Sequence, residues 1–335
     1  MIWCVYADVS RESGIWLKAK VKNYPRVCLV LAYFGRWPAW MEYFLESCRR
    51  NPEYNWLIFT DIGQLPSPCS NVQVQQITYA DLKHRAESVS GLPVSLEHPY
   101  KVCDLKPLYG RIFQQELLEY DFWGYTDLDV IYGRLPEFVP AAELAGCDVF
   151  TAAPRLIVGH FTLFRNSPQV SDLFLRVPNL RQILSEYECV AFDEQAFAAQ
   201  IEHEAAAGLL RLKRSAIQLD DSACLREGRQ RFLILRTSSG LWDVATARRL
   251  AYYHFIQTKY RQGFAVQQLQ QHQWWVADQK GIRCVPGGWR GLGLCWPALL
   301  SLLTAIPSHL RAVGRMLLSA ETRRRIRHLA GKGKT

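Results

Sequence analysis

A strand, a helix and a second strand near the start of the chain place the strongest constraint on its fold. Residues 26–33 form a continuous apolar run typical of a buried strand, and this pattern breaks in the Phe-Gly-Arg-Trp-Pro segment at residues 34–38. A helix with proline in its first turn can follow over residues 39–50, because Pro52 stops it. Residues 56–59 form a second short apolar run. This order predicts an α/β fold with a mostly parallel sheet flanked by helices.

Further elements are expected along the first two thirds of the chain. Asp104 can cap a helix that runs to about residue 120. Residues 148–151 and 160–164 have the composition of strands, and residues 193–201 have an acidic start followed by helical spacing. The sequence contains no internal repeat and no low-complexity stretch.

Size and composition are those of an ordinary folded protein. The chain has 335 residues, 49% of them hydrophobic, so it can bury a large core as one α/β domain with an extension or as two domains. Its ten cysteines are scattered, form no Cys-x-x-Cys pair and mostly lie in apolar surroundings, which indicates a reducing cytosol. The sequence shows neither a secretory leader nor a stretch of the ~20 apolar residues that a spanning helix needs. We therefore expect a cytoplasmic protein.

The end of the chain is the basic part. Residues 308–335 contain eight Lys and Arg and one Glu, so this segment carries seven of the nine net positive charges. Apolar residues share one helical face between residues 310 and 317, and such a basic amphipathic helix can lie on an anionic membrane surface. We expect membrane contact within residues 289–328, peripheral to the inner face of the cytoplasmic membrane. A solvated helix, a partner-binding face or a nucleic-acid contact is the alternative, although nucleic acid is not the expected partner.

We expect three parts: an N-terminal extension at residues 1–23, an α/β domain at residues 24–260, and a helical basic extension at residues 261–335. The character of the sequence changes after about Arg261, where it becomes Gln-rich and then rich in Trp and Gly.

Asp127-Leu128-Asp129 follows an aromatic run and has the pattern of a metal site at the end of a strand. In an extended backbone the two carboxylates point to the same side and can bind one hard divalent cation. A solvated turn or a helix cap is the alternative. In a parallel sheet the ends of neighbouring strands meet at one edge, so residues 34–35, 60–61 and 127–129 are expected to line one crevice.

Two long motifs carry a resemblance to a known family. Residues 99–107 (Pro-Tyr-Lys-Val-Cys-Asp-Leu-Lys-Pro), residues 121–129 (Asp-Phe-Trp-Gly-Tyr-Thr-Asp-Leu-Asp) and Gly133 resemble a poorly characterised bacterial family of GT-A-fold glycosyltransferases from capsule and O-antigen polysaccharide loci. Residues 33–35 and 59–61 are also similar, and the match spans roughly residues 24–260. More distantly, the order of elements is similar to that of glycogenin-like glycosyltransferases. The resemblance implies a GT-A-like fold, Rossmann-like in its nucleotide-binding half.

The resemblance also implies roles for individual residues. It implies metal binding by Asp127, Asp129 and His254, and roles beside the transferred sugar for Asp193 and Glu194. The residues that it implies at the donor are Tyr33, Phe34, Gly35, Asp61, Lys101, Asp104, Lys106, Gly159, Gln195 and Lys259. The spacing from His254 to Lys259 departs from the glycogenin-like pattern, which has a glycine after the histidine and one more residue before the lysine.

Each of these roles has a plainer alternative. Asp104 can be an ordinary helix cap, Asp193 and Glu194 can be the acidic start of a helix, and His254 can be a core residue.

The expected activity is metal-dependent transfer of a sugar from a nucleoside-diphosphate sugar to a cell-surface polysaccharide or lipid-linked glycan. Two carboxylates and one imidazole suit Mn²⁺ or Mg²⁺, whereas zinc would require more Cys or His. A sugar-nucleotide nucleotidyltransferase is the second hypothesis, although the loop after the first strand lacks the glycine-rich basic pattern of a phosphate loop. A non-catalytic module with the same fold is the third.

Overall fold

The computed structural model describes residues 24–222, 233–238, 240–244, 246, 248–269 and 274–285. The chain divides into two units, Met1–Gln218 and Leu219–Thr335. The predicted extension at residues 1–23, the predicted helix at 310–317 and the predicted membrane segment at 289–328 lie outside the described residues. The three-part division with a boundary near residue 261 stays a prediction.

The first unit alternates strands and helices. Its strands are β1 (Val27–Ala32), β2 (Tyr54–Thr60), β3 (Val72–Gln76), β4 (Phe122–Thr126), β5 (Val130–Tyr132), β6 (Val149–Thr151), β7 (Phe161–Arg165) and β8 (Leu212–Arg214). Its α-helices are α2 (Met41–Arg49), α3 (Tyr79–Ser90), α4 (Tyr109–Ile112), α5 (Ala141–Ala145), α6 (Pro168–Ser171), α7 (Leu180–Ser185) and α8 (Ala196–Ala206). The 3-10 helices are η1 (Pro99–Leu108), η2 (Leu135–Glu137) and η3 (Leu173–Arg176).

Seven of these strands form one sheet in the order β3-β2-β1-β4-β7-β6-β8. β1 runs parallel to both β2 and β4, β2 runs parallel to β3, and β6 runs parallel to β8. β7 is antiparallel to β4 and to β6. The prediction of an α/β fold with a mostly parallel sheet flanked by helices is confirmed.

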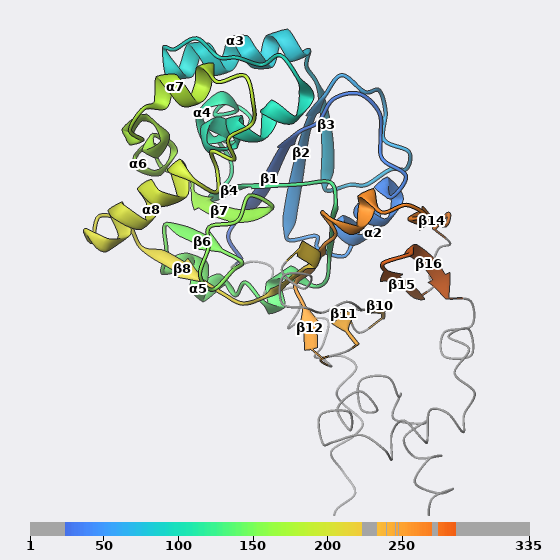
Figure 1. The fold of residues 1–335 in the computed structure, drawn as a ribbon. Coiled ribbons are helices and arrows are strands. Elements are labelled where there is room, and N and C mark those ends of the chain that lie inside the picture. Colours follow the sequence, from blue (N-terminus) through green and yellow to red (C-terminus); the bar gives the residue numbers. More distant parts are fainter. Residues whose placement is uncertain are drawn as a thin grey trace, which may run out of the picture. The chain divides into compact units, whose positions relative to one another are not determined.

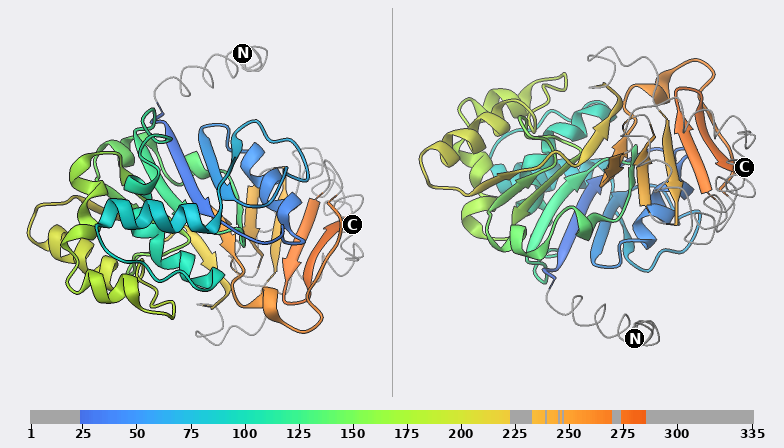
Figure 2. Two further views of the ribbon diagram at one scale, coloured as in Figure 1. Left: turned by 90° about the horizontal axis from the view of Figure 1, so that it is seen from above. Right: turned by 90° about the horizontal axis from the view of Figure 1, so that it is seen from below.

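Helices pack on both faces of this sheet. Leu57 and Phe59 of β2 belong to the same core cluster as Leu82 of α3, and Figures 1 and 2 show α3 grouped with α4, α6, α7 and α8 beside the sheet. Trp56 points to the opposite face because successive strand residues alternate. There its ring lies 5.3 Å from that of Tyr132, which contacts Phe44 of α2. Both faces of the central strands are therefore buried, as their continuous apolar sequences predict.

The helix expected from Asp104 to residue 120 is different in the structure. Residues 99–108 form the 3-10 helix η1, and α4 ends at Ile112. Pro107 inside η1 lacks the N–H that an α-helical bond would need, which favours the tighter 3-10 turn. Asp104 lies within η1 and does not cap it.

The other expected elements are present with small shifts. Strands β6 and β7 correspond to the segments expected at 148–151 and 160–164. The helix expected at 193–201 begins later, because Gln195 is the N-cap of α8.

The second unit contains a six-stranded sheet in the order β12-β11-β10-β15-β16-β14. Its strands are β10 (Ile234–Thr237), β11 (Gly240–Asp243), β12 (Arg248–Leu250), β14 (Ala265–Val266), β15 (Trp274–Asp278) and β16 (Gly281–Val285). Three more elements lie near it in sequence: β9 (Gln218–Asp220), which begins at the unit boundary, β13 (Tyr252–His254) and the 3-10 helix η4 (Thr258–Tyr260). The described start of the predicted helical extension therefore consists of strands. Among the described residues, no helix is both long and apolar enough to cross a membrane.

Candidate functional site

The carboxyl ends of β1, β2 and β4 meet at one edge of the sheet because these strands are parallel neighbours. The loops that follow are joined directly, since the Gly35 N–H donates to the Asp61 carboxylate at 2.9 Å. Gly35 has a φ of +106°, a conformation that glycine adopts without strain. The predicted meeting of the loops after β1 and β2 is therefore present.

Partly exposed aromatic rings follow the end of β1. The ring of Tyr33 stacks on that of Trp37 with centroids 6.2 Å apart, and Phe34 packs edge-on against Tyr79 at 5.1 Å. The Tyr33 N–H donates to the Phe59 carbonyl at 2.9 Å, which continues the pairing of β1 with β2 beyond the strand. The loop thus offers flat apolar surfaces beside the Asp61 carboxylate.

Asp127 and Asp129 lie in the tight turn between β4 and β5. The sequence predicted an extended backbone here, but β4 ends at Thr126 and the turn itself brings the carboxylates together. Carboxylate oxygens of the two residues lie within 4.8 Å of each other. Asp129 is buried, the Asp127 side chain is 30% exposed, and the Trp40 indole N–H donates to the Leu128 carbonyl at 2.9 Å to hold the turn.

Lys106 of η1 connects this turn to two other segments. Its ammonium lies 2.7 Å from Asp127 Oδ1, 2.7 Å from the Gly159 carbonyl oxygen and 3.5 Å from Asp193 Oδ2. Burial alone would lower the pKa of Lys106, but the charges of Asp127 and Asp193 raise it well above its usual value. The lysine is therefore a fixed positive charge shared by two carboxyl groups.

Asp193 and Glu194 pack against the backbone of Gly159. Glu194 Oε1 accepts the Gly159 N–H at 2.7 Å. Burial raises the pKa of Asp193 to about 7, against the lowering effect of Lys106, and Glu194 and Asp127 add to the rise. Carboxyl groups outnumber the one ammonium here, so the donor set suits a further cation of the hard, oxygen-binding kind.

Lys101 and Asp104 form a buried pair behind this cluster. Lys101 Nζ lies 2.8 Å from Asp104 Oδ2, and both residues are almost completely buried. The Asp104 carboxylate accepts the N–H groups of Val190 and Phe192 at 2.9 and 2.8 Å. Lys101 also donates to backbone carbonyls on this segment, at Ile183 and Glu188. The pair fixes the chain that leads to Asp193, and a direct contact of either residue with a donor stays a prediction.

The remaining predicted residues have separate settings. Gln195 is exposed at the start of α8, and its N–H donates to the Ala191 carbonyl at 2.9 Å. In the second unit, the Lys259 ammonium lies 4.8 Å from the ring centroid of Tyr260.

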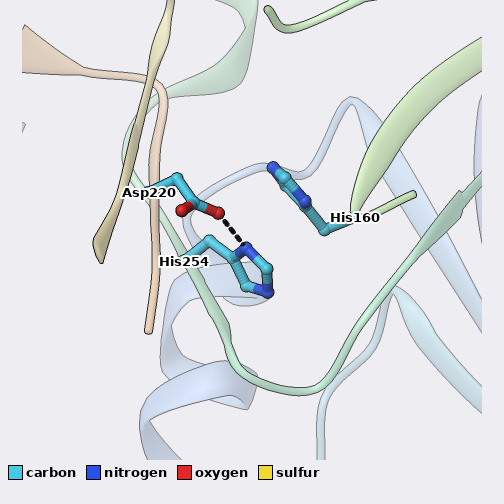
Figure 3. Close-up of side chains that lie close together, drawn as sticks. All are labelled: His160, Asp220 and His254. Carbon is cyan, nitrogen blue, oxygen red and sulfur yellow. Dashed lines mark hydrogen bonds and ion pairs between the residues drawn. The ribbon is translucent and has the colours of Figure 1, made fainter. Parts of the chain in front are cut away.

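His254 is buried in the second unit and has a carboxylate partner. Its Nδ1 lies 2.7 Å from Asp220 Oδ2, as Figure 3 shows. A cation bound by this ring would therefore be bound through Nε2, with the carboxylate fixing the orientation of the ring.

Asp221, next in the chain, organises the segment after His254. Its carboxylate accepts the N–H groups of Gln257 and Thr258 and the Thr258 hydroxyl at 2.7 to 3.0 Å. These bonds hold the η4 turn that carries Lys259. Asp220 and Asp221 were not predicted from the sequence, where their adjacency after an alternating segment was the available signal.

Comparison with known proteins gives a family and several likenesses of fold. Residues 29–283 match the model of a family described as "Family of unknown function (DUF6625)". No curated protein matches the chain.

Three solved structures are similar in fold. One is described as PaToxG glycosyltransferase, with 14% identity, a TM-score of 0.33 and coverage of 59% of this chain and 79% of the other. Mouse xyloside xylosyltransferase 1 in its apo form has 11% identity, a TM-score of 0.37 and coverages of 71% and 99%. The galactosyltransferase LgtC, in complex with donor and acceptor sugar analogues, has 12% identity, a TM-score of 0.36 and coverages of 85% and 99%. These likenesses concern the fold and not the activity.

Proposed function

The chain belongs to the family of unknown function DUF6625, and from its own residues we propose that it is a metal-dependent glycosyltransferase. It would move a sugar from a nucleoside-diphosphate sugar to a glycan or lipid-linked acceptor. The observation that carries the proposal is the pair of carboxylates, Asp127 and Asp129, within 4.8 Å of each other beside Lys106. They follow β4 at the edge where parallel strands end, which is where such sheets bind ligands.

We propose Asp127 and Asp129 as ligands of Mn²⁺ or Mg²⁺, with His254 as the third. Two carboxylate oxygens within 4.8 Å can share one cation at metal–oxygen distances of about 2.0 to 2.6 Å. The Asp220 contact supports the role of His254, because carboxylates commonly orient metal-binding imidazoles in this way. A bound cation would neutralise charge on the departing diphosphate.

The chain's other residues supply binding and orientation. The rings of Tyr33 and Phe34 suit a nucleobase, and the Asp61 carboxylate beside them suits ribose hydroxyls. Lys106 holds the Asp127 and Asp193 carboxyl groups toward one point. There Asp193 and Glu194 could accept hydrogen bonds from hydroxyls of the transferred sugar.

The negative charge of the donor's diphosphate would be neutralised in part by a basic side chain. Lys259 is proposed to stabilise the leaving diphosphate, and the Asp221 hydrogen bonds that fix its turn support this role.

A nucleotidyltransferase remains the second candidate and a non-catalytic module the third. A nucleotidyltransferase would need a glycine-rich basic phosphate loop after β1, whereas Phe34, Gly35 and Arg36 offer one glycine and one arginine. A module that only binds would have no use for a buried aspartate beside a second carboxylate and a shared lysine, since such charge is costly to bury.

The test is the melting temperature of the full-length protein with a panel of nucleoside-diphosphate sugars and Mn²⁺, Mg²⁺ or EDTA. A ligand that binds only the native state raises this temperature. We expect one donor class to stabilise the wild type in the presence of metal, and Asp129→Asn to lose the response. Glu119→Gln is the matched control, because it removes one negative charge from an exposed side chain paired only with Arg26 in the described contacts. If Asp129→Asn responds like the wild type across the panel, the proposed site is wrong.

A further inference from the structure

Two cysteines from distant parts of the sequence meet beside the candidate site. Cys103 lies in η1, and Cys189 lies in the segment between α7 and α8. The side chains of Cys103 and Cys189 interact, and the Cys189 thiol donates to Asp104 Oδ1 at 3.4 Å. The two thiols and the Asp104 carboxylate therefore form one cluster.

The backbone around the two thiols is held independently of the sulfur contact. Asp104, the residue after Cys103, accepts the N–H of Val190, the residue after Cys189, at 2.9 Å. The same carboxylate accepts the Phe192 N–H at 2.8 Å. Because both neighbours are fixed through one buried carboxylate, the cysteines stay side by side.

This pair differs from the other described thiols of the first unit. Cys103 and Cys189 are partly exposed, whereas Cys28, Cys48, Cys69 and Cys147 are buried. The hydrogen bond from Cys103 lowers the pKa of Cys189, while burial raises the pKa of both Cys48 and Cys69. A lowered pKa and access to solvent both favour thiol oxidation, and Cys189 combines the two.

We propose that Cys103 and Cys189 form an oxidisable dithiol, a modification site at which a peroxide or a small-molecule disulfide produces an intramolecular disulfide. With hydrogen peroxide, the Cys189 thiolate attacks one oxygen, the O–O bond breaks, and Cys189 becomes a sulfenic acid as hydroxide leaves. The Cys103 sulfur then attacks the Cys189 sulfur, and water leaves with the sulfenic oxygen. Two thiols and one peroxide give one disulfide and two waters, so two electrons pass from the sulfurs to the peroxide.

The link would join the two segments that position the candidate site. η1 carries Lys106, and the Cys189 segment leads to Asp193, whose carboxyl group lies 3.5 Å from the Lys106 ammonium. Oxidation also removes the proton that Cys189 donates to Asp104. Oxidation is therefore expected to change the metal-dependent rise in melting temperature that the donor produces. This consequence alone rests on the proposed function.

The experiment maps disulfides in the full-length protein. Reduced protein is treated with hydrogen peroxide or glutathione disulfide, remaining thiols are alkylated, and peptides from a digest are identified by mass spectrometry. We expect a peptide pair linked through Cys103 and Cys189 that disappears on reduction with dithiothreitol. The pair is absent from Cys103→Ser and Cys189→Ser and present in Cys147→Ser, the matched control for a buried thiol elsewhere in the same unit.

A second measurement needs no variant. In unoxidised wild type, iodoacetamide is expected to alkylate Cys189 at least tenfold faster than Cys48. Equal or slower labelling of Cys189 overturns the proposal. So does a digest in which Cys48–Cys69 or an intermolecular disulfide forms while Cys103 and Cys189 remain free. Detection of the link without any change in the donor response would leave the dithiol established and remove only its connection to the proposed activity.

Discussion

At residue 159 the chain has no room for a side chain. A Cβ at this position would meet Asp193 Oδ2 at 2.2 Å and Glu194 Oε1 at 3.2 Å. The Gly159 carbonyl also accepts a hydrogen bond from Lys106, and its N–H binds Glu194. The Lys106 ammonium and the carboxyl groups of Asp193 and Glu194 therefore all pack against the backbone of Gly159.

Gly159→Ala is expected to displace Asp193 from Lys106. Overpacking of this kind costs about 1 to 3 kcal/mol of unfolding free energy, measured by urea denaturation. The metal-dependent donor response should be lost as well, because the carboxyl groups no longer converge. Gly146→Ala is the matched control, since its Cβ would meet nothing closer than the Ala142 carbonyl oxygen at 3.6 Å. Equal stability of both variants would contradict this account of Gly159.

Single residues show why part of the site could be predicted. Asp127 and Asp129 belong to one short motif, and the structure places their carboxylates within 4.8 Å as expected. Lys106 and Asp193 were each predicted separately, but their contact is set by the fold. Asp221 and the Cys103–Cys189 pair were missed, because their partners are dozens of residues away. Only Asp221 had a local signal, its position beside Asp220 after an alternating segment.

Among the elements, the strands β6, β7 and β8 of the first unit are linked by hydrogen bonds to one carboxylate, that of Asp148. Asp148 precedes β6 and accepts hydrogen bonds from Arg165, which ends β7, and from the side chain and backbone N–H of Arg211, which precedes β8. Hydrogen bonds from Arg211 are the main reason that the pKa of Asp148 falls to about 2. The carboxylate thus joins the start of β6 to both of its neighbours in the sheet.

Asp148→Asn should make the unfolding free energy depend less on pH between pH 4 and pH 2.5. The pKa of Asp148 is lower in the folded state than the value of about 3.9 expected when unfolded, so its contribution is complete above pH 4 and is lost as pH falls toward 2. At pH 7 the variant should lose about 1 kcal/mol of unfolding free energy, because the charged partners are partly exposed to solvent. Urea denaturation between pH 7 and 2.5 should show the difference from wild type shrinking below pH 4. A constant difference across this range would mean that the charge of Asp148 is not what stabilises the strands.

Secondary structure was easiest to predict where the pattern had one solution. The buried runs of β1 and β2 and the helix between them appear within two residues of expectation, because continuous apolar sequence bounded by loop residues suits a parallel strand. The prediction of one α-helix from Asp104 to about residue 120 was wrong, because only Tyr109–Ile112 of this range is α-helical. Asp104 turned inward to bind distant N–H groups, and Pro107 favoured a 3-10 turn. A side chain suited to a cap can equally serve a long-range contact, and sequence alone does not separate the two.

For the whole molecule, the mostly parallel sheet of the first unit was predictable from the sequence, and the sheet of the second unit was not. Strand, helix and strand implied a parallel sheet, and the edge where β1, β2 and β4 end followed from it. The sheet of the second unit consists of strands of two to five residues. Runs of two to five residues contain too few alternations between apolar and polar positions to stand out from loops.

The distribution of charge leads to the last prediction. Seven of the nine net positive charges lie between Ser308 and Thr335, beyond the described residues, so removing residues 291–335 leaves a net charge of only +2. Each basic side chain near an anionic membrane contributes about 1 kcal/mol, and salt screens this attraction. We propose that the full chain therefore sediments with anionic vesicles at low salt and that the truncated chain stays in the supernatant. Two controls distinguish attraction by charge from apolar contact. One uses neutral vesicles, and the other uses the full chain with Arg323, Arg324 and Arg325 changed to Gln. Both should reduce sedimentation. Equal sedimentation of the full and truncated chains with anionic vesicles would place the membrane contact elsewhere or remove it.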